Sequence, residues 1–99
     1  QRVPFRNMIY IGDSDTDIPC MSLVNANGGH SIGVYDPEEQ NKDKVYKMMR
    51  HHRIRYYAPA DYSESSRLDT IVKQIIDKTA AYEALERQYV QDKQEAEKN

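Results

Sequence analysis

The chain has 99 residues, enough for one small domain and too few for two. Its 38% hydrophobic and 30% charged content is typical of a soluble globular protein, and its net charge of −2 gives no overall bias toward nucleic acid or membranes. The sequence contains neither an apolar run near the roughly 20 residues that span a bilayer nor a signal peptide pattern. Cys20 is the only cysteine, so no internal disulfide can form and we expect a cytoplasmic location.

The first predicted strand is the apolar run of residues 8–11, which is rich in β-forming side chains. We expect this strand to be buried on both faces, as strands of parallel sheets are. Asp17 and Pro19 then supply a cap and an early proline for a helix that ends near residue 24 or 25. On this helix, we expect Cys20 to be a small buried thiol.

Two further strands are predicted at residues 31–35 and 56–59. Between them, Asp36 and Pro37 with the acids that follow predict the start of a second helix. The expected core face of this helix consists of Val45, Met48, Met49 and His52. Because strands and helices alternate, the sequence predicts an α/β fold, a partial Rossmann-like parallel sheet of about three strands with crossover helices.

A long C-terminal helix is predicted from Ser66 to about Lys98, a stretch without glycine or proline. Ser66 is its expected cap, with Asp69 completing a box-like pair. Its apolar stripe alternates spacings of three and four residues, and Lys78 is the one polar interruption; the stripe consists of Leu68, Ile71, Ile75, Tyr82, Leu85 and Tyr89. We expect residues 1–76 to form the core domain, and residues 77–99 to form a helical tail that either lies in solvent or pairs with another helix.

The most informative segment is the acidic loop, residues 11–17, in which a predicted strand runs into Gly12 and then Asp13, Asp15 and Asp17. Ligands of open α/β sheets gather at the carboxyl ends of strands, and acids placed there favour a shared Mg²⁺ ion that also holds phosphate oxygens. A calcium loop of the EF-hand type does not fit, because it needs glycine where the chain has Ile18. Helix capping alone stays open as the second interpretation.

Residues 8–21 resemble the fourth conserved motif of the haloacid dehalogenase-like hydrolases, in which a hydrophobic strand is followed by Gly-Asp, three residues and a second Asp. The resemblance implies that Asp13 binds Mg²⁺ and that Asp17 supports the metal site through coordinated water or a catalytic lysine. Asp15 matches a variable position. Residues 29–37 and 57–63 look like the pattern that follows this motif in phosphoserine phosphatase-like members, so the resemblance covers about residues 3–76.

The family's nucleophile motif, Asp-x-Asp followed by Thr or Val, is mimicked only superficially by residues 13–17, because Gly12 separates them from the strand and Asp17 occupies the Thr place. The chain has no other candidate for this motif. Arg2 and Arg6 are the only basic residues before the acidic loop, and we interpret them as part of a solvated turn. The resemblance implies that the nucleophile strand pairs beside residues 8–11, so that its absence exposes an edge that recruits other strands. Since the sequence opens at Gln1 rather than at a methionine, we expect a processed product or a piece of a longer protein.

The resemblance therefore implies that the chain is the C-terminal fragment of a magnesium-dependent phosphohydrolase that acts on a small phosphorylated substrate through an aspartyl-phosphate. We expect the fragment to be inactive alone and to associate with its missing N-terminal half or with itself. The alternative is a non-catalytic interaction module that keeps the fold and binds a partner through the C-terminal helix. The basic and aromatic cluster of residues 42–57 favours a solvated crossover helix over nucleic-acid binding.

Overall fold

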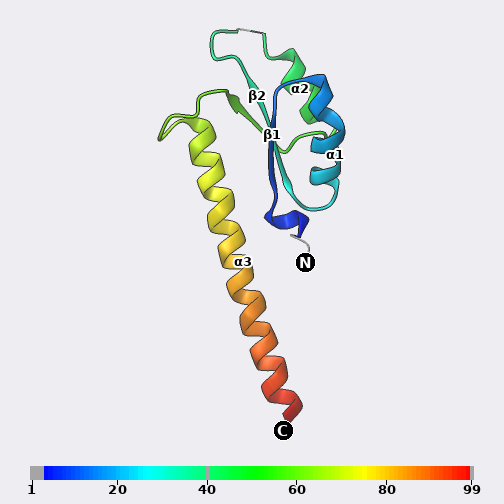
Figure 1. Cartoon of the computed structure of the whole chain (residues 1–99), viewed down its shortest axis with the longest axis vertical. Coiled ribbons are helices and arrows are strands. Elements are labelled where there is room, and N and C mark those ends of the chain that lie inside the picture. Colours follow the sequence, from blue (N-terminus) through cyan, green and yellow to red (C-terminus); the bar gives the residue numbers. More distant parts are fainter. Residues whose placement is uncertain (1–3, 40, 99) are drawn as a thin grey trace.

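The computed structural model describes residues 4–39 and 41–98, which form a three-stranded parallel sheet in the order β1-β2-β3. Helices α1 and α2 cover one face of the sheet, and the long helix α3 crosses the other (Figure 1). The elements are η1 (Phe5–Asn7, a 3-10 turn), β1 (Ile9–Gly12), η2 (Asp15–Asp17, a 3-10 turn), α1 (Ile18–Ala26), β2 (His30–Tyr35), α2 (Asp43–Arg50), β3 (Tyr56–Pro59) and α3 (Arg67–Lys98). The predicted α/β class, the parallel sheet and the long C-terminal helix are confirmed.

Strand β2 is the centre of the sheet and pairs in parallel with β1 on one side and β3 on the other. Its alternating side chains serve both faces, because neighbouring residues of a strand point to opposite sides. Ile32 is fully buried toward α3. Gly33 faces the other side, where a β-carbon would stand 2.9 Å from Cδ1 of Ile54 and 3.2 Å from Cε of Met48. Glycine here lets α2 and its following loop pack close to the sheet.

The core consists of two clusters, one on each face of the sheet. On the α3 side the buried residues are Ile32, Val34, Ala58, Leu68, Ile71 and Ile75. On the α1 and α2 side they are Met21, Val45, Met48 and Ile54. Two residues expected in this second cluster lie outside it. Cys20 is exposed, although its side chain contacts Tyr10 of β1, and His52 is exposed with a φ of 59° in the turn after α2.

Helix α2 begins later than the sequence signals at Asp36 and Pro37 predict. Instead of opening a helix, Asp36 closes a turn: its Oδ1 atom accepts the N–H of Glu38 at 2.9 Å, and its carbonyl oxygen accepts the N–H of Glu39 at 3.0 Å. An aspartate followed by proline is equally suited to a turn and to a helix start. The helix starts at Asp43, whose N–H is bound by the Asn41 side chain at 2.9 Å.

Strand β1 is not buried on both faces, contrary to the prediction from its apolar sequence. It is an edge strand of the described sheet, paired with β2 alone, and 37% of Ile11 is exposed. A strand with one free side carries unpaired backbone N–H and C=O groups that can bind another strand. The apolar character of β1 therefore fits a central strand better than the edge strand that it is here.

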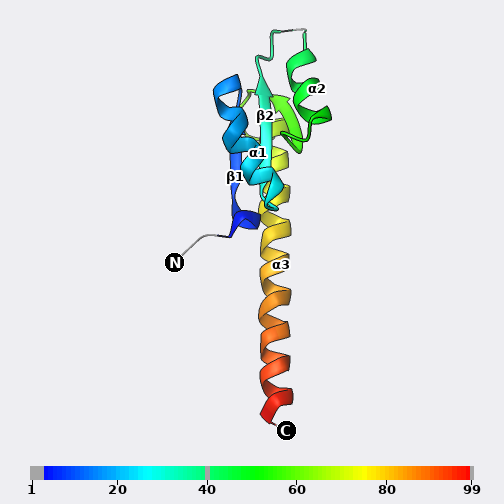
Figure 2. The ribbon, with the colours of Figure 1, turned by 90° about the vertical axis from the view of Figure 1, so that its right-hand side faces the viewer.

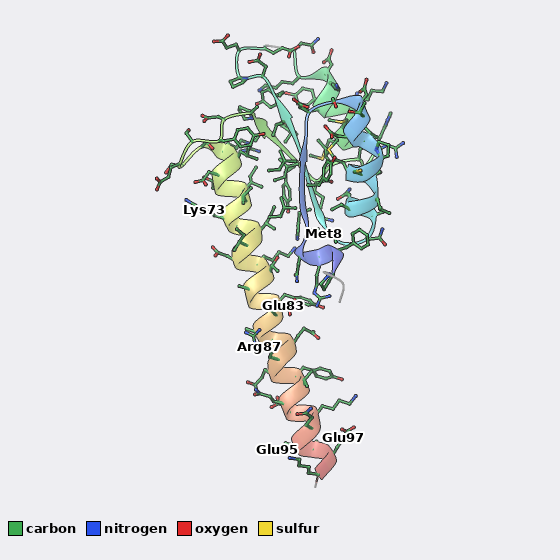
Figure 3. The ribbon with its side chains drawn as sticks, viewed as in Figure 1. Met8, Lys73, Glu83, Arg87, Glu95 and Glu97 are labelled. Atoms are coloured by element: carbon green, nitrogen blue, oxygen red, sulfur yellow. The ribbon has the colours of Figure 1, made fainter. Side chains whose placement is uncertain are left out.

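Helix α3 has 32 residues, about 48 Å at 1.5 Å per residue, and extends far below the sheet (Figure 1; Figure 2). Only Leu68, Ile71 and Ile75 are buried, all within its first three turns. The helix continues without interruption through residues 76 and 77, and Glu83 still reaches back to Arg6 at 3.3 Å (Figure 3). None of the helices in the described part of the chain is long and apolar enough to cross a membrane.

The predicted N-terminal cap of α3 is confirmed. The Oγ atom of Ser66 accepts the N–H of Asp69 at 3.1 Å. The carboxylate of Asp69 returns to the N–H of Ser65 at 2.9 Å, one residue earlier than in the usual capping box. The same carboxylate forms an ion pair with Lys73, and these contacts lower the pKa of Asp69, with the Lys73 contact as the largest cause.

Two alanine substitutions on α3 test whether only its first turns pack against the sheet. Ile75→Ala should lower the free energy of unfolding by about 2–4 kcal/mol, because it leaves a cavity against the sheet. Leu85→Ala should change it by less than about 0.5 kcal/mol, since 72% of this side chain is exposed. Urea denaturation measures both. A loss at Leu85 as large as that at Ile75 would contradict the structure.

Candidate functional site

The acidic loop lies at the carboxyl end of β1, as the sequence predicts. Asp13 follows the strand directly, Ser14 precedes η2, and Asp17 is the last residue of η2 before α1. Pro19 occupies the first turn of α1, where a missing N–H costs nothing. The loop thus joins the end of an edge strand to the start of a helix, and its shape depends on how its polar groups are paired.

The carboxylate of Asp17 turns back over the loop and accepts four hydrogen bonds. Its Oδ2 atom accepts the N–H of Asp13 at 3.1 Å, and the N–H and hydroxyl of Ser14, both at 3.2 Å. Its Oδ1 atom accepts the hydroxyl of Tyr10 at 2.9 Å. This carboxylate therefore holds the loop against the strand, and it is already engaged by protein donors.

These donors change the acidity of both partners. The Tyr10 hydroxyl is the largest cause that lowers the pKa of Asp17, followed by the N–H groups of Ser14 and Asp13. The same contact raises the pKa of Tyr10 to about 12. Asp17 is consequently a stable anion at neutral pH. It is suited to hold the loop in shape and poorly suited to take up a proton.

Gly12 makes this arrangement possible. A β-carbon at this position would stand 2.7 Å from the Cβ atom of Asp17 and 2.8 Å from its Oδ2 atom, closer than real β-carbons come to other atoms. The glycine of the Gly-Asp pair is thus needed so that the Asp17 carboxylate can lie against the end of β1. The glycine in the sequence pattern of the acidic loop is therefore explained by the lack of space beside Asp17.

Asp13 contrasts with Asp17, because its side chain is exposed and has no recorded hydrogen bond or ion pair within the described residues. It borders a hollow of about 300 Å³ at the carboxyl ends of β1 and β2. Asp36, which follows β2, lines the same hollow together with Lys42 and Lys44 from the start of α2. The free carboxylate therefore faces a space that contains both acidic and basic groups.

Lys44 is the residue that the sequence interpretation missed. It was grouped with the solvated basic cluster, yet its Nζ atom lies 3.3 Å from the carbonyl oxygen of Asp13 and 3.5 Å from Oδ1 of Asp15. The signal that predicts this contact is topological: in a parallel sheet, the loops after β1 and β2 lie at the same end. Both side chains of the ion pair are at least half exposed, so it adds little to stability.

The residues of the acidic loop fit a magnesium ion only in part. Within residues 4–39 and 41–98, no group of three or more His, Cys, Asp or Glu side chains is arranged to hold a metal. Mg²⁺, however, is often bound by one or two carboxylates, with water and substrate phosphate as its other ligands. Asp13 can serve as such a direct ligand, while Asp17 can reach an ion through water. Metal binding by Asp13 and Asp17 stays a prediction.

Removing the Tyr10 hydroxyl tests the hydrogen bonds of the loop. In Tyr10→Phe the pKa of Asp17 should rise toward its ordinary value, because the largest cause of its lowering is gone. A carboxyl pKa lowered on folding adds stability above the unfolded pKa, and this stability is lost as the pH falls through the folded value. The variant should therefore lose less stability on acidification. Carboxyl ¹³C titration and urea unfolding at several pH values measure the two effects.

Tyr62→Phe is the matched control, since Tyr62 is exposed and has no recorded partner in the described part of the chain. It should leave the titration of Asp17 unchanged. An Asp17 pKa that is the same in the Tyr10 variant and in the original chain would show that the loop is not held by this bond.

Comparison with protein-family models, with curated proteins and with solved structures finds no match to this chain. The resemblance to haloacid dehalogenase-like hydrolases therefore remains a prediction from the acidic loop and the strand pattern. What stands independently of it is a parallel three-stranded sheet that places one free and one engaged carboxylate at the end of an edge strand.

Proposed function

We propose that this chain is the C-terminal portion of a magnesium-dependent phosphohydrolase of the haloacid dehalogenase-like type. In this proposal the chain contributes the acidic part of the metal site, and the aspartate that attacks a small phosphorylated substrate comes from elsewhere. The observation that carries the proposal is the exposed carboxylate of Asp13 at the carboxyl end of β1, a strand with one open side.

The open side of β1 supports the idea that a strand is added there. A parallel strand paired with β1 would end at the same edge of the sheet as Asp13, so an aspartate at its end would share a cation with Asp13. The exposed side chain of Ile11 fits the same view, since an added strand and its helix would cover it. We propose that the missing N-terminal half, or a second copy of the chain, occupies this edge.

Each residue of the acidic loop would then have a separate task. Asp13 would ligate the ion, which when bound neutralises phosphate charge and orients the reacting groups. Asp17 would keep the N–H groups of Asp13 and Ser14 in place, because its oxygens already accept four hydrogen bonds. Lys44 would partly offset the negative charge of Asp15.

The exposed, unpaired thiol of Cys20 supports a reducing, cytoplasmic setting.

Paramagnetic Mn²⁺, used in place of Mg²⁺, tests the metal site. Added to the 99-residue chain, it should broaden the amide signals of residues 12–17 most strongly, with weak affinity because the site is incomplete. Asp13→Asn should reduce this broadening about tenfold or more at a given Mn²⁺ concentration, since a direct carboxylate ligand is lost. Two-dimensional ¹H–¹⁵N spectra measure the effect.

Asp15→Asn is the matched control, because it removes the same charge from the same loop two residues away. It should weaken the broadening by no more than about twofold, the expectation for a screened surface charge. Equal losses in both variants would show that the loop attracts cations only by its overall charge. The metal assignment of Asp13 would then be wrong.

The chain by itself should not hydrolyse phosphate esters. Neither the described structure nor the sequence supplies an Asp-x-Asp nucleophile on a strand beside β1. When the pure protein is incubated with p-nitrophenyl phosphate and Mg²⁺, it should release p-nitrophenol no faster than the Asp13→Asn variant does under the same conditions. Magnesium-dependent turnover that disappears in Asp13→Asn would refute the proposal that the nucleophile lies elsewhere.

A second function has its own supporting observation. The far half of α3 carries exposed apolar side chains, among them Leu85, Tyr89 and Val90, beyond its last buried residue. An interaction module that binds a partner helix through this surface would explain them without any catalysis. Sedimentation of Leu85→Glu distinguishes the two functions. If this variant breaks up an assembly, the helix is the contact surface. If the assembly survives it, the edge of β1 is the better candidate.

A further inference from the structure

A second hollow lies at the opposite end of the sheet from the acidic loop. It has a volume of about 210 Å³ and is lined by Arg6, Gly28, His30, Lys78, Thr79 and Tyr82. His30 is the first residue of β2, whereas the acidic loop follows the last residue of β1, and the strands run parallel. The hollow is therefore bounded by η1, the amino end of β2 and the fourth and fifth turns of α3, and it is separate from the candidate metal site.

His30 lines this hollow and is almost fully buried. Only 6% of the residue is exposed. Its Nε2 atom lies 2.9 Å from the carbonyl oxygen of Arg6, and since a carbonyl only accepts, Nε2 must be the donor. The other nitrogen, Nδ1, is buried and has no hydrogen-bond partner among the residues that the structure describes. A buried polar atom without a partner is costly, and in native proteins it usually meets water or a ligand.

Arg6 has another buried polar atom without a hydrogen-bond partner among the described residues. Its guanidinium lies 4.7 Å from the centre of the Tyr82 ring, and its Nη2 atom lies 3.3 Å from Oε1 of Glu83. These contacts fix the side chain, but its Nε atom is buried and has no partner within the described part of the chain. The arginine N–H can only donate. The residues around the hollow thus include an unused donor on a cation as well as the free nitrogen of His30.

Lys78 supplies a further positive charge and explains the break in the apolar stripe of α3. It lies between Ile75 and Tyr82, at a position where the alternating spacing of three and four residues predicts an apolar side chain. It lines the hollow, and it has no recorded hydrogen bond or ion pair within residues 4–39 and 41–98. Arg6 and Lys78 together carry two positive charges against the single negative charge of Glu83. The hollow has an excess of positive charge.

We propose that this hollow is a binding site for a small phosphate-type oxyanion. Phosphate oxygens would accept hydrogen bonds from Arg6 and Lys78. His30, whose Nε2 atom is bonded to the carbonyl oxygen of Arg6, would form part of the wall of the site. The hollow is smaller than the roughly 300–1,000 Å³ of drug-sized pockets, so it suits a phosphate group with a small substituent. This inference does not depend on the proposed hydrolase function.

Titration of the 99-residue chain with inorganic phosphate tests the site, at constant ionic strength and without divalent cations. The amide signals of Gly28, His30 and Thr79 and the ring signals of His30 should shift and saturate. The amide of Ser14 in the acidic loop should not move. Shifts that grow linearly without saturation, or that centre on residues 12–17, would overturn the proposal.

The variant that removes a phosphate contact is Lys78→Gln, at an exposed helix position where folding is not at risk. It should weaken phosphate binding about tenfold, the usual effect of losing one charged hydrogen bond. Lys93→Gln, which removes the same charge from the far half of α3, should change the affinity less than twofold. Equal weakening by the two variants would show attraction by net charge alone, and the site would be rejected.

Discussion

Strand β2 is the constraint on which the rest of the structure depends. It is hydrogen-bonded to a strand on each side and covered by helices on both faces, so a change in its register would move both core clusters at once. Two neighbouring residues of β2 serve its two faces: Ile32 fills the side that α3 covers, and Gly33 leaves room for Ile54 on the other side. Both hollows lie at its ends, one beside Tyr35 and one beside His30.

The acidic loop shows how residues of the same type acquire different roles through their surroundings. Asp17 lies where a strand, a turn and a helix start converge, and its oxygens accept hydrogen bonds from Tyr10, Ser14 and the N–H of Asp13. The side chain of Asp13 lies outside these hydrogen bonds and is exposed. A negative charge that organises a loop and one that meets a ligand are separated by only four residues, and Gly12 is the residue that lets them coexist.

Features that depend on local spacing could be predicted from the sequence. The three strands, helix α1, the Ser66 cap and the length of α3 follow from periodicity, prolines and capping residues. Where one signal serves two local structures, as Asp36 does for a turn and a helix, the prediction was wrong. The contact of Lys44 with Asp13, 31 positions earlier in the chain, has no local sequence pattern, so only the parallel order of the strands could have indicated it.

Helix α3 is one continuous element with two very different local stabilities. Its first turns are held by packing on the sheet, and its contact with η1 ends at Glu83 (Figure 3). Beyond that point the backbone depends on helix propensity and on side-chain pairs such as Gln88 with Asp92, which stabilise an isolated helix only weakly. The last turns will therefore open and reclose many times while the sheet stays folded. In the free chain, this end of the molecule fluctuates between helix and coil, and any partner that binds it as a helix must first remove that freedom.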